Sequence, residues 1–160
     1  MRRDEIFILG AAAVVLLSII SFKSRLTAVL SKFIPSVEGF RSTPYWDAKR
    51  YSWGYGTAAP GPTGTITRSQ AFTDMLQYLF NDFTKLKPRI TRSLNVNQWA
   101  ALLSFSYNTG VGSAYKLVSE INSHNDEALF AHMRQYKYSE GEVNPDLVAR
   151  REKEIKLWTS

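Results

Sequence analysis

The sequence predicts a mainly α-helical protein with a small β-hairpin sheet, which follows an apolar amino-terminal segment. Three observations predict this class. Apolar residues recur at helical spacing through most of the chain after residue 25. Residues 45–57 instead combine aromatic side chains with two glycines, a pattern typical of short strands. Residues 6–22 carry no charge at all. We therefore divide the chain into an anchor segment, residues 1–25, and one domain, residues 26–160.

Composition narrows the classes of function. The chain has 160 residues, 44% of them apolar, which is enough for one folded core and excludes a disordered protein. Its net charge of +6 favours a polyanionic partner, and nucleic acid, an anionic membrane surface and an acidic cell wall all fit that description. The basic residues are scattered, and no zinc-finger or RNA-binding motif is present, so we expect no nucleic-acid partner.

The chain contains no cysteine, which excludes disulfide bonds, thiol catalysis and cysteine metal sites. Its two histidines, His124 and His132, stand outside any cluster of metal-binding residues in the sequence. We expect a monomer that binds no metal and needs no cofactor.

The uncharged segment IFILGAAAVVLLSIISF, residues 6–22, lies between Arg2 and Arg3 on one side and Lys23 and Arg25 on the other. As a helix it would be about 25 Å long, against roughly 30 Å of bilayer hydrocarbon, so it predicts a marginal membrane anchor. A cleaved signal peptide is an alternative, although no small-x-small cleavage site follows Phe22. A buried core helix is a second alternative. The basic residues on the two sides of the segment are similar in number, so they do not determine which end would face the cytoplasm.

Residues 26–37 carry apolar side chains at helical spacing, but Pro35 predicts a kink or a restart just before Glu38. Residues 45–57 then predict a small twisted hairpin sheet. The stretch from residue 58 to residue 64 contains two prolines and two glycines and predicts a loop.

Two capping boxes predict the starts of two further helices. Thr67 and Gln70 open a helix that Pro88 ends, and its length of about 30 Å could join two lobes. Asn95 and Gln98 open a second helix over residues 99–107, which is apolar nearly all round and so predicts the buried centre of the carboxy-terminal lobe. Further helices are expected at about 114–122, 126–136 and 145–158.

Two carboxylates near the hairpin, Glu38 and Asp47, could cleave a glycosidic bond. One would be a protonated general acid, and the other a charged group that assists water or an oxocarbenium-like transition state. Glu38 stands among apolar neighbours, and burial raises a carboxyl pKa, so it is the better candidate for the acid. Two acids nine residues apart are common in proteins, however, so the spacing alone is a weak signal.

The residues around this pair resemble the catalytic segment of the phage-type lysozymes, the family of T4 lysozyme and phage endolysins. The resemblance covers about residues 36–158. Its motifs are E-G-x-R at 38–41, Y-x-D at 45–47, S-x-G-Y-G at 52–56, N-Q-W-A-A-L-L-S-F-S-Y-N-T-G-V-G at 97–112, and L-V-A-R-R-x-x-E at 147–154. This combination is highly specific, and it implies a two-lobed lysozyme-like fold.

The resemblance implies a Glu, an Asp and a Thr as the site residues. Glu38 matches the general acid, and Asp47 matches the second carboxylate. The position of the family's Thr holds Ser52, which keeps the hydroxyl, and Thr57 replaces the family's usual His and is the weaker candidate for the third residue. The implied activity is hydrolysis of the β-1,4 bond between N-acetylmuramic acid and N-acetylglucosamine in peptidoglycan, with inversion expected. A lytic transglycosylase and a non-catalytic, membrane-anchored wall-binding or pore-forming protein are the alternatives.

Helical spacing predicts a further supporting residue, Arg151, on the last helix. Arg151 shares a face with Leu147, Ile155 and Trp158, so we expect it to point inward. A buried arginine needs a carboxylate, and Glu38 is the expected partner, with a side chain that reaches out to solvent as the alternative.

An apolar segment joined to such a domain is similar to the signal-anchor-release endolysins. In that group, an uncleaved segment of weak hydrophobicity tethers an inactive enzyme to the periplasmic face of the host inner membrane and later leaves the bilayer, which frees active enzyme into the periplasm. Some members are controlled by cysteine exchange, which this chain lacks the residues for. Restraint by conformation is therefore expected, since Glu38 follows Phe22 by only sixteen residues.

Overall fold

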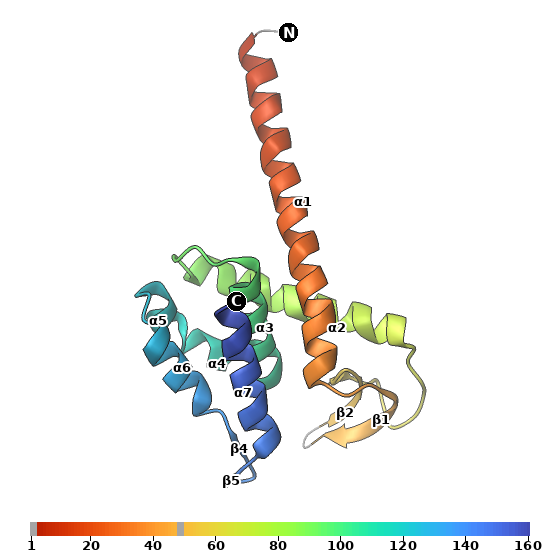
Figure 1. Ribbon diagram of the computed structural model, residues 1–160. Coiled ribbons are helices and arrows are strands. Elements are labelled where there is room, and N and C mark those ends of the chain that lie inside the picture. The colour runs from red at the N-terminus through yellow and green to blue at the C-terminus, as the bar shows by residue number, and fades with distance from the viewer. Residues whose placement is uncertain (1–2, 48–49) are drawn as a thin grey trace.

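The computed structural model describes the backbone of residues 3–47 and 50–160 and the side chains of residues 17–47 and 50–160. Its elements follow the chain in this order: α1 Arg3–Val37, β1 Arg41–Asp47, β2 Arg50–Gly54, β3 Thr57–Ala58, α2 Arg68–Leu86, a 3₁₀ turn η1 Lys87–Arg89, α3 Val96–Thr109, α4 Val111–Tyr115, α5 Val118–Asn122, α6 Asp126–Arg134, β4 Tyr138–Ser139, β5 Glu142–Val143 and α7 Pro145–Trp158. The protein is thus mainly α-helical with small antiparallel sheets, as the sequence predicted (Figure 1).

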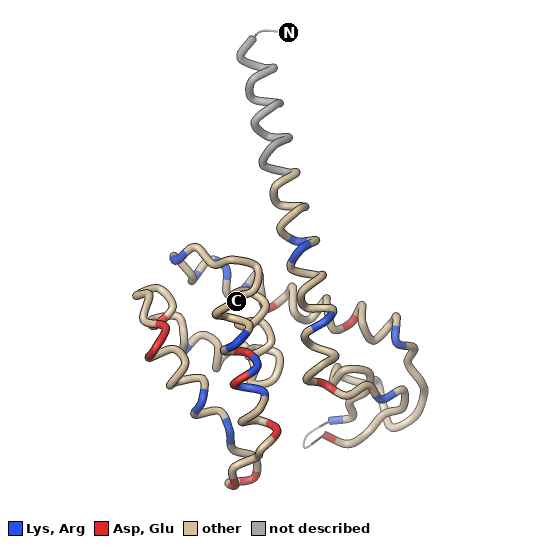
Figure 2. Tube along the Cα trace, viewed as in Figure 1, with Lys and Arg blue, Asp and Glu red and all other residues tan. Residues whose placement is uncertain are grey.

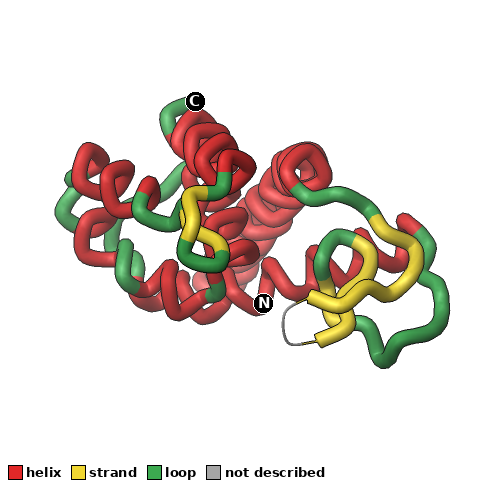
Figure 3. Tube along the Cα trace, turned by 90° about the horizontal axis from the view of Figure 1, so that it is seen from below, coloured by secondary structure: helices red, strands yellow, loops and turns green. Residues whose placement is uncertain are grey.

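Two lobes flank α1. The three-stranded sheet, in the order β1-β2-β3, lies on one side, and the carboxy-terminal helices lie on the other (Figure 3). In the antiparallel pairing of β1 with β2, Tyr45 lies opposite Ser52 and Asp47 opposite Arg50. The long helix α2 begins beside the sheet and ends in the helical lobe, so it joins the two lobes (Figure 1).

Helix α3 forms the centre of the helical lobe. Eight consecutive residues of it, 99–106, are buried, and it packs against α1, α2, α4 and α7. Both predicted capping boxes are present, because the side chains of Thr67 and Asn95 accept from the amides of Gln70 and Gln98. Gly110 ends α3 with a φ of 86°, a conformation that glycine adopts readily.

Helix α1 passes through Pro35 without a break, which corrects the expected restart before Glu38. Pro35 stands in the last turn, where its missing amide removes only one hydrogen bond. Leu26, Leu30 and Ile34 on the same helix are fully buried at four-residue intervals. Their burial against the helical lobe stabilises this part of α1 and outweighs the cost of the proline.

The sequence prediction of a membrane anchor over residues 6–22 falls largely on residues 6–16, which lie outside the described side chains. In the part of the chain that could be searched, no helix is both long and apolar enough to cross a membrane. Of the residues 17–22, Leu17, Ile19 and Ile20 are exposed by 66%, 58% and 55%. This portion of α1 therefore presents apolar side chains to its surroundings.

Candidate active site

Glu38 directly follows the last turn of α1, and its amide donates to the carbonyl of Ile34 at 2.8 Å. The buried residues of α1 hold this turn against the helical lobe, so the position of Glu38 is fixed by the packing of the helix. Its side chain is 23% exposed. The carboxyl is therefore largely enclosed but still reachable from solvent.

One oxygen of the Glu38 carboxylate is held by an arginine from the far end of the chain. Nη1 of Arg150, on α7, lies 2.5 Å from Oε1 of Glu38. The sequence prediction that Arg151 pairs with Glu38 is therefore wrong, although Arg151 does point inward and is only 1% exposed. The buried side of α7 is wider than the apolar stripe indicated, because it also includes Arg150 and Glu154.

The two arginines share a buried carboxylate, Glu154. Oε1 of Glu154 accepts from Nε of Arg150 at 3.2 Å and from the Ser104 hydroxyl at 2.7 Å. Arg151 forms a salt bridge to the same carboxylate, with Nε and Oε2 3.0 Å apart, and donates to Oδ1 of Asn108 at 2.8 Å. Burial raises the pKa of Glu154, and the two guanidinium groups oppose that rise. The guanidinium groups of Arg150 and Arg151 are thus balanced by the carboxylates of Glu38 and Glu154.

The second oxygen of Glu38 faces the sheet lobe. A Cβ added to Gly56, just after β2, would lie 4.0 Å from Oε2 of Glu38. Next to it, the carbonyl of Tyr55 accepts a hydrogen bond from the Tyr107 hydroxyl of α3 at 2.9 Å. Burial raises the pKa of Tyr107, and the charge of Glu38 raises it further. Glu38 therefore lies where α1, the hairpin and α3 meet.

Asp47 ends β1 and lies beside Ser52. The hydroxyl of Ser52 donates to Oδ2 of Asp47 at 3.5 Å, and Ser52 is fully buried. Tyr45 connects this pair electrostatically to Glu38, since burial raises the pKa of its phenol and the charges of Asp47 and then Glu38 raise it further. Ser52 lies opposite Tyr45 in the sheet, and the charges of Asp47 and Glu38 both act on the Tyr45 phenol.

Thr57, the weaker sequence candidate for the third residue, lies on β3 opposite Trp53. Its hydroxyl is buried and has no hydrogen-bond partner among the described residues, and it would lie 3.7 Å from a Cβ added at Gly54. No hydrogen bond to Asp47 is found for it in that part of the chain. The hydroxyl that the structure places next to Asp47 is that of Ser52.

Some aromatic residues of the hairpin are packed in the core, and others are exposed to solvent. Tyr55 is buried and packs on Phe40, with ring centroids 5.5 Å apart. Trp46 is 62% exposed and packs edge-to-face with Tyr51, with ring centroids 5.2 Å apart. Trp46 and Tyr51 are therefore the aromatic pair that a sugar could reach, whereas Tyr55 belongs to the core.

Among the side chains of residues 17–47 and 50–160, no group of three or more acidic or histidine residues is arranged to hold a metal ion. The functional groups that the fold places at the site are carboxylates and hydroxyls, with a guanidinium on Glu38. Sequence reasoning missed three parts of the site: Arg150, Tyr107 and Glu154. Arg150 and Glu154 stand four residues apart, and that spacing was the available signal for an ion pair on the buried face.

Comparison with known proteins identifies the family of the chain. The model of the family described as phage lysozyme matches residues 35–154. The endolysin of Bacillus phage PZA is 32% identical over 138 residues, which make up 79% of this chain and 52% of that protein. The chain therefore spans about half the length of this curated relative.

Two solved structures share the fold. The muramidase domain of SpmX from Asticaccaulis excentricus superposes with a TM-score of 0.75 at 22% identity, covering 82% of this chain and 95% of that one. The endolysin from Escherichia coli O157:H7 phage FAHEc1 gives a TM-score of 0.67 at 23% identity, covering 78% and 87%. At these identities the likeness concerns the fold alone. The family match covers three quarters of the sequence and leads to one conclusion: the chain belongs to the phage lysozyme family.

Proposed function

We propose that this protein is an endolysin that hydrolyses the β-1,4 bond between N-acetylmuramic acid and N-acetylglucosamine in bacterial peptidoglycan. One observation carries the proposal. Arg150 holds Oε1 of Glu38, while Oε2 faces the hairpin that bears Asp47 and Ser52. A carboxyl with one fixed oxygen and one available oxygen is suited to protonate a leaving group at a defined position.

In the proposed reaction, Glu38 gives its proton to the glycosidic oxygen as the bond to the anomeric carbon breaks. Asp47, as a carboxylate, stabilises the positive charge that develops on the sugar and then accepts a proton from the attacking water. Exchange with solvent afterwards removes that proton from Asp47 and returns one to Glu38. Ser52, hydrogen-bonded to Asp47, orients that water. The water oxygen bonds to the anomeric carbon from the opposite face, so the configuration inverts. Peptidoglycan is the substrate, and no cofactor takes part.

The first test replaces Glu38 with Gln, which keeps the size of the side chain but removes the transferable proton. We expect the rate of turbidity loss of a cell-wall suspension to fall by about 10²-fold or more, and Asp47→Asn to be similarly severe. Glu127→Gln, on the exposed face of α6, is the matched control and should keep full activity. Normal turnover by folded Glu38→Gln would overturn the assignment of the acid.

We further propose that residues 6–22 hold the inactive protein in the host inner membrane, with the domain on the periplasmic side, and that release from the bilayer activates it. Two features support this. The segment is uncharged and only marginally hydrophobic. It also shares one continuous helix, α1, with the turn that leads into Glu38, so a change in its position can reach the site through the helix. Because the chain lacks cysteine, the restraint is conformational.

A further inference from the structure

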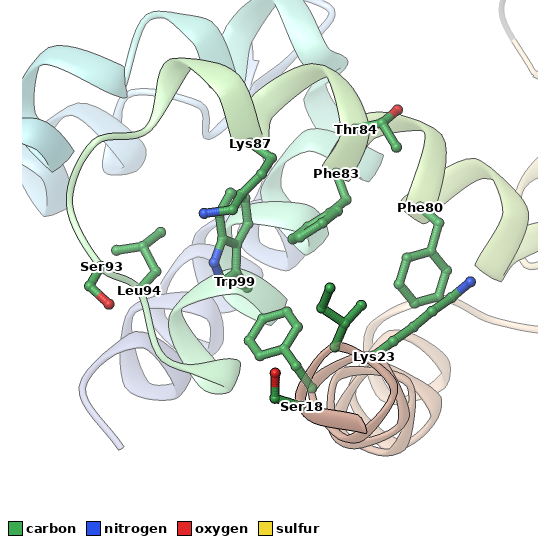
Figure 4. Close-up of a pocket in the computed structure, with 11 residues that line it drawn as sticks. Ser18, Lys23, Phe80, Phe83, Thr84, Lys87, Ser93, Leu94 and Trp99 are labelled. Atoms are coloured by element: carbon green, nitrogen blue, oxygen red, sulfur yellow. The ribbon is translucent and has the colours of Figure 1, made fainter. Parts of the chain in front are cut away.

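A groove lies between α1 and the helical lobe, away from the candidate active site. It has a volume of about 540 Å³, within the usual range of ligand pockets. Its apolar lining comes from three parts of the chain (Figure 4), namely Ile19 and Phe22 of α1, Phe80 and Phe83 of α2, and Leu94 and Trp99 at and before the start of α3. Phe83 packs on Trp99 with ring centroids 4.6 Å apart. The groove therefore offers a firm aromatic wall to an apolar occupant.

The charge at the rim of this groove is positive. Lys23 and Lys87 both line it (Figure 4), and no acidic residue does among those whose side chains are described. Nζ of Lys23 lies 4.8 Å from the ring centre of Phe80, and Nζ of Lys87 lies 5.8 Å from that of Trp99. Neither ammonium forms a salt bridge within the described part of the chain. Two cations beside an apolar floor match a molecule with an anionic head and a hydrocarbon tail.

The groove also lies where α1 leaves the body of the molecule, since Ile19 and Phe22 belong to the anchor segment (Figure 1). Basic residues mark both this part of α1 and the connection from α2 to α3 (Figure 2). From Phe22 to Glu38 the helix rises about 24 Å, so the groove is separate from the candidate active site. If residues 6–22 occupy the bilayer, the groove opens at the level of the lipid headgroups.

We propose that this groove binds an anionic phospholipid of the bilayer that holds the anchor. The anionic headgroup lies at the rim, which carries Lys23 on one side and Lys87 on the other, and the upper part of an acyl chain lies against Phe22, Phe83 and Trp99. The bound lipid stabilises the tethered state by adding a contact outside the bilayer core, and that contact is lost on release. The inference rests on the proposed anchoring of residues 6–22, and its test separates the two.

The test uses the full chain in vesicles of phosphatidylcholine with increasing phosphatidylglycerol, the latter carrying bromine on its acyl chains near the headgroup. Bromine quenches tryptophan only at short range, and comparison with Trp99→Phe isolates the emission of Trp99 from that of the other three tryptophans. We expect quenching of Trp99 that rises with phosphatidylglycerol. Lys23→Gln combined with Lys87→Gln should raise the phosphatidylglycerol fraction needed for half-maximal quenching several-fold, because each basic residue at an anionic surface strengthens binding about five-fold.

Two further variants sharpen the result. Lys137→Gln with Lys153→Gln removes the same charge away from the groove and should leave quenching unchanged. Thr84→Phe fills the groove without a change in charge and should lower Trp99 quenching, which general attraction to the surface would not explain.

Sedimentation with the vesicles after a high-salt wash tests the anchor independently. A chain that sediments without Trp99 quenching overturns the lipid site alone. A chain that does not sediment overturns the anchoring and the lipid site together.

Discussion

At the scale of single residues, Arg150 links the candidate site to the interior. Its guanidinium contacts the Glu38 carboxylate, the Glu154 carboxylate and the carbonyl of Ser104, and it is only 6% exposed. A planar group with several fixed donors can serve three acceptors at once. Arg150 is therefore a positioning residue that sets the direction of the Glu38 carboxyl.

Arg150→Lys keeps the charge but cannot reach all three acceptors. We expect kcat to fall about ten-fold with little change in KM, and the free energy of unfolding to fall by about 2 kcal/mol, because a buried acceptor loses its donor. Steady-state kinetics on soluble glycan and denaturant unfolding measure the two effects. The matched control is Arg134→Lys. Arg134 forms a bidentate salt bridge with Glu152, but this pair is half exposed and should contribute little to stability. Equal losses in both variants would contradict the positioning role.

Removing one hydroxyl at a time distinguishes Ser52 from Thr57 as the third site residue. Ser52→Ala removes the donor to Asp47 and should lower turnover about ten-fold, the scale of one hydrogen bond. Thr57→Val removes a hydroxyl that has no partner in the described part of the chain, so activity should persist and stability should hold or improve. Turbidity assays and thermal unfolding compare the pair. The opposite order of effects would make Thr57 the third residue.

At the scale of elements, local signals predicted helix starts well. The capping boxes at Thr67 and Asn95 involve residues three positions apart, so the sequence carries all the information they need. The hairpin of β4 and β5 was missed because its strands have two residues each, too few to show alternation. Its turn at Glu140 and Gly141, with φ values of 53° and 86°, was the only local signal.

Contacts between distant parts of the chain could not be predicted in the same way. The Glu38–Arg150 pair joins residues 112 positions apart, and the choice between neighbouring arginines depends on how α7 is rotated against α3. Glu38, Asp47 and Ser52 could be predicted from short sequence motifs, because Asp47 and Ser52 lie in one hairpin and Glu38 stands just before it. The groove at Phe22 and Trp99 needed three separate elements to come together, and no single stretch of sequence indicates it.

The anchor segment within α1 has a prediction of its own, based on its marginal hydrophobicity. Leucine at positions 10–13, in place of Gly10 and the three following alanines, should hold the protein in the inner membrane and prevent lysis, since each leucine adds a few tenths of a kcal/mol to insertion. Val14→Lys should block insertion or hasten release, at a cost of about 2.5–3.5 kcal/mol. Cell fractionation beside a lysis assay checks both. Lysis on the normal schedule by a four-leucine variant that stays wholly in the membrane would show that release is not the switch.

At the scale of the whole molecule, carboxylates paired on the helical lobe make stability depend on pH. Hydrogen bonds from Arg92 hold the pKa of Asp126 below its usual 3.8. Those from Arg134 also hold the pKa of Glu152 below 4.5, but this pair is half exposed and contributes only a small part of the effect. Because both pKa values are lower in the folded state, their stabilisation is complete above the unfolded values and is lost as the pH falls through the folded ones.

We therefore expect the free energy of unfolding to fall as the pH is lowered from about 5 to about 2. Denaturant unfolding at a series of pH values measures the slope. Asp126→Asn should make the slope shallower in this range, because it removes one of the groups that take up a proton on unfolding. A slope in Asp126→Asn as steep as in the original protein would contradict the importance of the Arg92 pair.

The most direct measurement of the central claim is the product formed from peptidoglycan in water enriched in ¹⁸O. Hydrolysis places one oxygen atom from water on the cleaved sugar. Mass spectrometry should therefore find reducing N-acetylmuramic acid ends that carry a single ¹⁸O, and Glu38→Gln should abolish them. Anhydromuramic ends without ¹⁸O would mean a lytic transglycosylase, and binding to the wall with no cleaved glycan would mean a protein without catalytic activity. Either result would contradict the account.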